Sequence, residues 1–327
     1  MLDTPVVLIV FKRLDSTRMI LERVRTVQPK KLYIISDQGR NDEEIALVKQ
    51  VRDLIEDMVT WECELVKDYA KENRGVYEQI GMGALRVFQT EERAIFLEDD
   101  NLPEVSFFSY CEQMLEAYKD ENQILWVCGT NYFGITEAQD GSDIHFTQHL
   151  LPCGWASWAN KFTKYYDKDL RLTEDPDWER KLRAAYRDKR LFVQQSDSVK
   201  REIKKKLTGE RYHSWDFHMV FSVKMNGLLG IAPTRNQITN IGIDEHSIHG
   251  AKAGDEMTER FHNVPSYPMP SVCKIPDEIK IDSVFEKKTG EVILYPLGVR
   301  FRMRIKKILR VPDGMRFRDW LRIGKNR

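Results

Sequence analysis

Residues 94–101, with the sequence AIFLEDDN, join a short apolar run directly to three consecutive carboxylates. Four apolar residues that stop abruptly at polar ones are typical of a strand buried inside a sheet. In open α/β sheets, ligands bind just outside the carboxyl ends of the strands. The stretch therefore predicts a strand that ends at an acidic ligand site.

The three carboxylates Glu98, Asp99 and Asp100 require an opposite charge. Two carboxylates about 4 Å apart repel by roughly 4 kcal/mol at the effective dielectric of a partly buried site. Mg²⁺ or Mn²⁺ relieves this repulsion and completes its shell with substrate phosphates and water. Side chains alternate along a strand, so we expect Asp100 on the metal and Asp99, on the other side, nearer a ribose or sugar hydroxyl. The alternatives are a solvated acidic loop, or a phosphatase nucleophile, which residues 101–103 do not support.

The composition limits the class of protein. With 327 residues, 42% of them hydrophobic, the chain can bury one large core or two modest ones. A formal net charge of zero argues against a nucleic-acid-binding role for the whole protein. Five cysteines without a C-x-x-C spacing favour a reducing compartment. The apolar run Val6–Phe11 is too short for a signal peptide or a membrane span, so we expect a soluble, cytoplasmic protein.

Apolar runs alternate with segments of helical periodicity in the first half of the chain. This alternation predicts βαβ units and a mostly parallel sheet, and therefore an α/β fold. No glycine-rich fingerprint follows the first strand, where Lys12-Arg13-Leu14-Asp15 stands, so a nucleotide is held in some other way. Gly81-Met82-Gly83-Ala84 lies within a predicted helix and indicates close helix packing. The predicted strands are 6–11, 31–36, 61–66 and 94–97, and the predicted helices are 15–27, 45–58 and 76–88.

The second half elaborates the first without a recognisable linker. An aromatic turn at 151–158 is either a plug in the core or a wall on which a sugar ring packs. Ser214 is a plausible helix cap, and Asp216 in the following turn favours the helix dipole. His246 and His249 are either solvated or in contact with a metal or diphosphate. The other expected elements are a helix at 105–118, a strand at 124–128, an irregular loop at 129–150, charged helices within 175–210 and a strand at 228–232.

The C-terminal tail is basic and amphipathic. Residues 299–327 hold eleven Lys or Arg against two Asp, and apolar residues are interleaved with them. Such segments lie on anionic membrane surfaces. A nucleic-acid patch and a simple docking helix are the alternatives. We favour the membrane because the rest of the chain carries no nucleic-acid signature.

The order of these features resembles the GT-A glycosyltransferases. More narrowly, it resembles the N-acetylglucosaminyltransferase I group and its bacterial relatives in surface polysaccharide synthesis. The resemblance covers roughly residues 5–250. It rests on the motifs Phe11-Lys12-Arg13, Ser36-Asp37-Gln38-Gly39, Glu72-Asn73-Arg74-Gly75, Ile95–Asp100, Phe107-Phe108, Gly154-Trp155, Trp215-Asp216 and the 240–249 segment.

The resemblance implies a Rossmann-like GT-A domain at 1–264, with a nucleotide-sugar half at 1–130 and an acceptor half at 131–264, followed by an extension at 265–327. It also implies Mn²⁺ or Mg²⁺ as cofactor. The eukaryotic group has a second acid directly after the base, where this chain has Phe217. By position, the implied site residues are Asp216 as base, Asp100 and His249 at the metal, Arg13, Asp37, Arg74, Glu98 and Asp99 at the donor, and Gly154, Trp155 and Trp215 as the sugar wall.

The expected function is inverting transfer of a sugar from a nucleotide-diphosphate donor, a UDP-sugar, to a hydroxyl of a glycan or lipid-linked glycan. A divalent ion offsets the charge of the leaving diphosphate, and one carboxylate accepts the proton of the acceptor. We expect this sugar transfer to belong to bacterial surface glycan synthesis and to take place on the inner face of the cell membrane. The rivals are a nucleotidyltransferase, which usually carries a glycine- and basic-rich loop after its first strand, and a non-catalytic nucleotide- or glycan-binding module.

Overall fold

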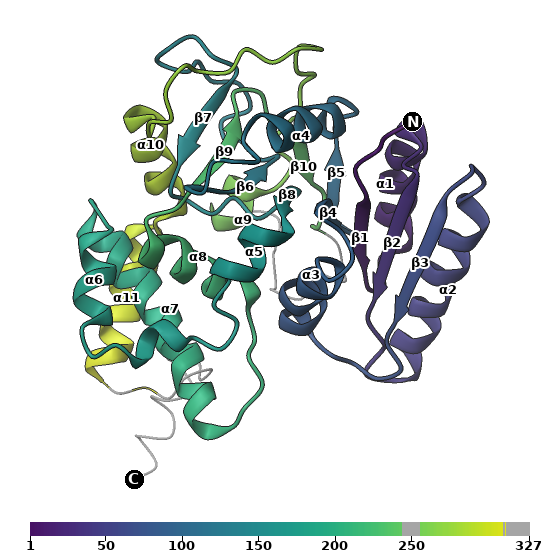
Figure 1. The fold of residues 1–327 in the computed structure, drawn as a ribbon. Coiled ribbons are helices and arrows are strands. Elements are labelled where there is room, and N and C mark those ends of the chain that lie inside the picture. The colour runs from purple at the N-terminus through teal and green to yellow at the C-terminus, as the bar shows by residue number, and fades with distance from the viewer. Residues whose placement is uncertain (244–255, 310, 312–327) are drawn as a thin grey trace.

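A mixed eight-stranded sheet with helices on both faces forms the centre of the described molecule (Figure 1). The computed structural model describes residues 1–243, 256–309 and 311. The strand order is β3-β2-β1-β4-β8-β6-β9-β7, and only β8 and β7 run against the others in this described sheet. The α/β prediction is confirmed. The strands are β1 (Val6–Val10), β2 (Lys31–Ser36), β3 (Glu64–Tyr69), β4 (Arg93–Glu98), β6 (Ile124–Cys128), β7 (Ile144–Thr147), β8 (Trp155–Trp158) and β9 (Leu229–Pro233).

β1, β2, β3 and β4 are parallel, and β1, β2 and β4 carry the core on both faces. Alternate residues of β1 enter different hydrophobic clusters, with Val6, Leu8 and Val10 on one face and Val7 and Ile9 on the other. Every residue of β1 is buried, as its uninterrupted apolar run predicts. Helices α1 (Leu14–Val27), α2 (Asp42–Met58) and α4 (Ser106–Ala117) contribute to the first cluster. The π-helix η1 (Tyr77–Gly81) and α3 (Met82–Val87) contribute to the second.

The prediction for residues 76–88 is confirmed as helical, with a π-helical turn at its start. Gly81 is the residue that permits close packing there. A Cβ at this position would lie against the hydroxyl oxygen of Tyr166 and 3.1 Å from the Cβ of Trp215. The interpretation of the Gly81–Ala84 segment as a close helix contact is therefore confirmed.

Several predicted elements are wrong in their bounds or in their capping. The aromatic turn at 151–158 contains β8, which lies antiparallel between β4 and β6 at the middle of the sheet. The loop at 129–150 contains β7, which forms the edge beyond β9. The third strand begins at Glu64 rather than at Trp61, because Trp61 packs against the core from the preceding loop. Ser214 stands at the helix N-cap position, but its side chain makes no capping hydrogen bond.

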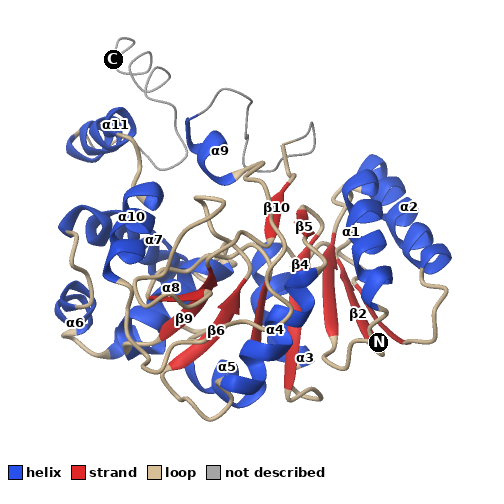
Figure 2. Ribbon diagram, turned by 90° about the horizontal axis from the view of Figure 1, so that it is seen from above, coloured by secondary structure: helices blue, strands red, loops and turns tan. Residues whose placement is uncertain are grey.

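A small antiparallel pair stands beside the end of β4. It consists of β5 (Asn101–Pro103) and β10 (Ile238–Asn240), which lie side by side in Figure 2. Asn101 pairs with Asn240, so the chain segment after the acidic triplet meets a segment far along the sequence. The remaining helices are α5 (Ala159–Tyr165), η2 (Arg171–Glu174), α6 (Trp178–Ala184), α7 (Lys189–Thr208), α8 (Trp215–Asn226), α9 (Glu256–Phe261), α10 (Ser283–Ile293) and α11 (Leu297–Ile308).

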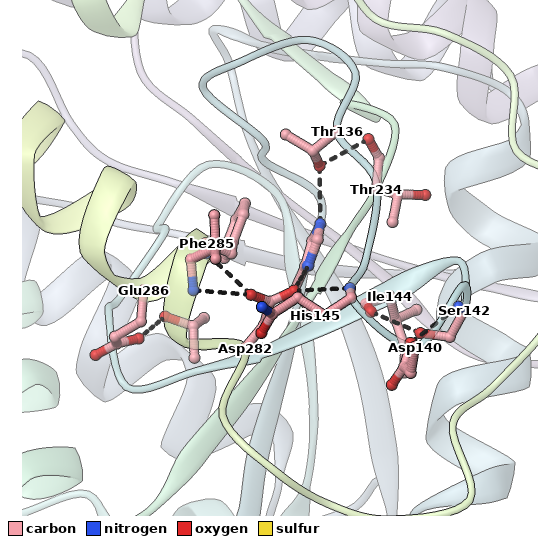
Figure 3. A network of polar contacts seen from close by, with 12 residues as sticks. Thr136, Asp140, Ser142, Ile144, His145, Thr234, Asp282, Phe285 and Glu286 are labelled. Carbon is pink, nitrogen blue, oxygen red and sulfur yellow. Dashed lines mark hydrogen bonds and ion pairs between the residues drawn. The ribbon is translucent and has the colours of Figure 1, made fainter.

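The described part of the 265–327 extension packs against the sheet. Met269 and Cys273 are buried in the first cluster, and Phe285 of α10 is buried in the second. Figure 3 shows the contact, here called the α10 seam, between β7 and α10. In it, Nδ1 of His145 lies 2.9 Å from Oδ2 of Asp282, and Nε2 lies 2.8 Å from the hydroxyl of Thr136.

To cross a bilayer, any of the described helices would need about 20 predominantly apolar residues. None of those within 1–243 or 256–309 has both the length and the apolar character needed to cross a membrane.

Candidate active site

A cavity of about 200 Å³ opens where β4 ends. Glu98 and Asp100 line it from the acidic triplet, and Asp216 lines it from the first turn of α8. Asp216 is remote from the triplet in sequence, and α8 reaches it by packing on η1 and α5. The cavity therefore brings the predicted base and the predicted metal ligand together.

The acidic triplet divides as strand alternation predicts. Glu98 and Asp100 line the cavity, whereas Asp99 is 6% exposed and turns toward the end of β1. The backbone N–H of Phe11 donates to Oδ2 of Asp99 at 2.8 Å, and Nη1 of Arg13 donates to Oδ1 at 2.9 Å. Asp99 thus holds the loop that carries Arg13. Contact of Asp99 with a ribose or sugar hydroxyl stays a prediction.

Arg13 is the basic partner of the triplet. Besides its bond to Asp99, Nη1 lies 3.2 Å from Oδ2 of Asp100. The arginine stands at the N-cap position of α1, in the short loop after β1, so the parallel pairing of β1 with β4 brings it to the acids. Its charge lowers the Coulomb energy of two carboxylates at once.

Three carboxyl groups, those of Glu98, Asp100 and Asp216, line the same cavity and raise the cost of ionising one another. Burial, reinforced by the charges of Asp100, Asp99 and Asp216, holds the pKa of Glu98 well above its usual value. Burial also raises the pKa of Asp216 to about 6, although backbone hydrogen bonds at the start of α8 oppose this. A carboxyl group with a pKa near 6 is ionised at neutral pH and can accept a proton.

Asp37 organises a loop. It is 6% exposed, and its carboxylate accepts hydrogen bonds from the backbone N–H groups of Gln38, Arg74 and Gly75 at 2.8–2.9 Å and from Nδ2 of Asn73 at 3.1 Å. Gly75 has φ +84°, a value that favours glycine. Asp37 is therefore a positioning residue for the turn that presents Arg74.

The side chain of Arg74 is ion-paired within the first half of the chain. Its Nη1 lies 2.8 Å from Oδ1 of Asp68, a residue of β3. Contact of Arg74 or Asp37 with a nucleotide stays a prediction.

The three residues predicted as a sugar wall have different surroundings. Trp155 is 3% exposed and stacks on Phe96 with ring centroids 4.0 Å apart, which favours the core-packing alternative. Gly154 has φ +62°, and a Cβ there would lie 2.5 Å from the side chain of Ile238, so it too belongs to the core. Of the three, Trp215 is the one that lines the cavity.

Sequence reasoning missed several cavity residues. Oδ1 of Asn101 accepts a hydrogen bond from the N–H of Gly154 at 2.7 Å, while its Nδ2 donates to Asp100, so Asn101 orients the predicted metal ligand. Asn240 and His213 also line the cavity. Asn101 directly follows the triplet and could have been suspected from that position. Asn240 begins the 240–249 segment of the resemblance but was given no role in the site. His213 carries no sequence signal, because only the tertiary fold brings it to the cavity.

The carboxyl groups at the cavity are candidate ligands for a metal ion. Within residues 1–243 and 256–309, no group of three or more His, Cys, Asp and Glu side chains is arranged to hold an ion by itself. His249 lies outside the described residues. Glu98 and Asp100 nevertheless offer hard oxygen atoms to one cavity, and Mg²⁺ commonly takes one or two carboxylates together with substrate phosphates. These residues therefore fit a divalent ion that arrives with a diphosphate.

Comparison with known proteins gave distant structural similarities. No protein-family model matches the chain, and no curated protein sequence matches it. An apo UDP-glucose pyrophosphorylase is similar at 10% identity and a TM-score of 0.37, covering 73% of this chain and 93% of that one. Mouse xyloside xylosyltransferase 1 is similar at 11% identity and a TM-score of 0.35, covering 69% and 84%. A 4-diphosphocytidyl-2C-methyl-D-erythritol synthase from Anaerococcus prevotii is similar at 12% identity and a TM-score of 0.32, covering 54% and 82%. These similarities are too distant to carry an argument about function.

Proposed function

We propose that this protein is a metal-dependent glycosyltransferase that moves a sugar from a UDP-sugar to a hydroxyl group with inversion of configuration. The observation that supports the proposal most is the meeting of Asp216 with Glu98 and Asp100 in one cavity at the carboxyl end of β4. In such a reaction, Glu98 and Asp100 would bind the ion that stabilises the leaving diphosphate. Asp216 would accept the proton of the acceptor hydroxyl. A single base on the acceptor side is what an inverting transferase requires.

The residues at the cavity have distinct roles in this mechanism. Asp216, ionised above pH of about 6, accepts the proton from the acceptor hydroxyl as that oxygen attacks the anomeric carbon. Asn101 keeps Asp100 oriented, and Asp99 keeps Arg13 beside the triplet. A divalent ion, when bound by Glu98 and Asp100, supplies Lewis-acid stabilisation of the departing diphosphate. The acceptor is a glycan or a lipid-linked glycan of bacterial surface polysaccharide synthesis, as the resemblance implies.

Thermal-shift measurements with UDP, GDP, CDP and dTDP, each with and without Mn²⁺, test the binding half of the proposal. Ligand at about 100 times its dissociation constant adds roughly 2.7 kcal/mol to stability, which raises the midpoint by several degrees. We expect a Mn²⁺-dependent shift with UDP that Asp100→Asn removes and Asp216→Asn retains. Asp53→Asn, a change at an exposed carboxylate of α2, is the matched control. An undiminished shift in Asp100→Asn, or no shift with UDP, contradicts the proposal.

The identity of the released product separates transfer from nucleotidyl chemistry. A glycosyltransferase releases a nucleoside diphosphate, whereas a nucleotidyltransferase attacks the α-phosphate and exchanges pyrophosphate. Incubation with UDP-sugars and glycan acceptors should therefore yield UDP without pyrophosphate exchange. Pyrophosphate exchange would favour the nucleotidyltransferase alternative instead.

A further inference from the structure

Helix α11 exposes apolar side chains on one side. Leu297, Phe301 and Ile308 are 76%, 67% and 71% exposed. At 100° per residue, these three positions fall within about 40° of one another around the helix axis. None of the α11 residues is buried. The three side chains therefore form one strip, here called the α11 strip, that faces away from the described body of the protein.

The charge of α11 is entirely of one sign. The helix contains five basic residues and no acidic residue. Arg304 lies beside the α11 strip on one flank, about 20° from Leu297, and Arg302 lies on the other flank, about 100° beyond Phe301. Both arginines are exposed. An apolar strip with cations on both flanks matches a surface that combines acyl chains with anionic headgroups.

The body of the protein fixes the orientation of α11. At its C-terminal end, Nζ of Lys307 lies 3.0 Å from Oδ1 of Asp197 on α7. Just before its start, the N–H of Tyr295 donates to Oε1 of Gln194 on the same helix at 2.8 Å. Figures 1 and 2 both show α11 at the periphery of the molecule. Because α7 holds both ends, the α11 strip points outward as part of the folded protein.

We propose that α11 docks this protein on an anionic lipid bilayer, with the α11 strip inserted at the headgroup boundary and Arg302 and Arg304 on lipid phosphates. Nucleic acid would satisfy the arginines but would leave the apolar strip in water. A second copy of the chain would cover the strip and would bring the same positive charge against itself. Anionic lipid satisfies both features of the helix. This docking does not depend on the reaction proposed above.

Vesicle flotation of the full chain tests the docking. We expect binding to phosphatidylcholine vesicles that contain phosphatidylglycerol and little binding to pure phosphatidylcholine. The double variants Phe301→Ser/Ile308→Ser and Arg302→Glu/Arg304→Glu should each lower the partition coefficient by more than about tenfold, because each removes one component of binding.

Control variants use exposed residues of α1. Met19→Ser and Arg18→Glu make the same kinds of change on another helix and should bind as the wild type does. Unchanged thermal midpoints exclude misfolding as the cause of lost binding.

Three results would overturn the proposal. The first is equal wild-type binding to both kinds of vesicle, or binding to neither. The second is undiminished binding of both α11 variants. The third is a concentration-dependent dimer in light scattering that Phe301→Ser/Ile308→Ser abolishes, which would assign the α11 strip to a second copy.

Discussion

Acidification should weaken the packing of α10 on the segment just after β7 by forcing a proton onto His149. This side chain is 5% exposed, and its Nε2 lies 3.0 Å from the backbone oxygen of Glu286 in α10. A carbonyl oxygen only accepts, so Nε2 carries the proton of the neutral ring. Nδ1 has no hydrogen-bond partner among the described residues. Burial, opposed by the charge of Glu286, lowers the pKa of His149 to about 4. A second proton on this ring would therefore stand buried without a partner.

The expected loss follows from linkage. The unfolded chain binds this proton with a pKa of about 6.5, so between pH of about 6.5 and 4 it binds more protons than the folded chain does. The free energy of unfolding therefore falls as the pH falls through this window. At about pH 5, roughly 1.5 units below the unfolded pKa, the loss from His149 is about 2 kcal/mol.

Urea denaturation of the wild type and of His149→Gln, at about pH 7.5 and about pH 5, measures this term. Glutamine can keep a hydrogen bond to Glu286 but does not titrate. The wild type should lose about 2 kcal/mol more than the variant between the two values. Buried carboxyl groups with raised pKa values change the stability in the opposite direction, but they do so in both proteins and cancel in the difference. Equal losses in the two proteins would refute the reasoning.

Three further changes probe the site and its support. Asp216→Asn should lower the turnover number by about 10²-fold or more without removing the nucleotide-dependent thermal shift, and wild-type turnover should fall below pH of about 6, where Asp216 is protonated. Gly81→Ala should lower the free energy of unfolding by about 1–3 kcal/mol, because its Cβ meets the Tyr166 hydroxyl, and the urea midpoint reports this. Asp37→Ala should lose the hydrogen-exchange protection of the Arg74 and Gly75 amides while that of the β1 amides persists; unchanged exchange would contradict the assigned positioning role.

The first half of the fold could be predicted because its strands are buried on both faces. Continuous apolar runs identify β1, β2 and β4, and the helices between them fix a parallel arrangement. β3 was misplaced because it is the edge strand and none of its residues is buried. A half-exposed strand of mixed composition gives a weak pattern of hydrophobicity. Trp61 nearby gives a strong apolar signal because it packs against the core from the preceding loop, not because it belongs to the strand.

The second half could not be predicted to the same extent, because its pairing is non-local. β7 and β8 have four residues each, too few for a periodic pattern. β8 enters the sheet antiparallel, between two strands that the sequence places well before it. The tryptophans at its ends are buried by this insertion, so Trp155 became a core residue rather than a wall. A local sequence pattern shows that these tryptophans are apolar and clustered. It does not show whether they pack in the core or line a binding site.

The site was predictable where chemistry and strand direction coincide. The acidic triplet was placed correctly at the carboxyl end of a strand, since the apolar run before it identifies the strand and gives its direction. The predicted separation of Asp99 from Glu98 and Asp100 is also confirmed. Asp37 was marked by its position after a strand, but its four hydrogen bonds to the protein depend on a loop that the sequence does not place.

The charge balance of the cavity leads to a final expectation about the order of binding. Glu98, Asp100 and Asp216 line the cavity, and Arg13 pairs with one of them. A diphosphate brings at least two more negative charges, and each close pair of like charges costs about 4 kcal/mol at the dielectric of such a site. We therefore expect a nucleoside diphosphate to bind only with a divalent ion, so EDTA should abolish its thermal shift at neutral pH. If the shift instead survives EDTA and grows as the pH falls toward about 6, the compensating positive charge comes from protons on Glu98 and Asp216, and the metal has no part in holding the donor.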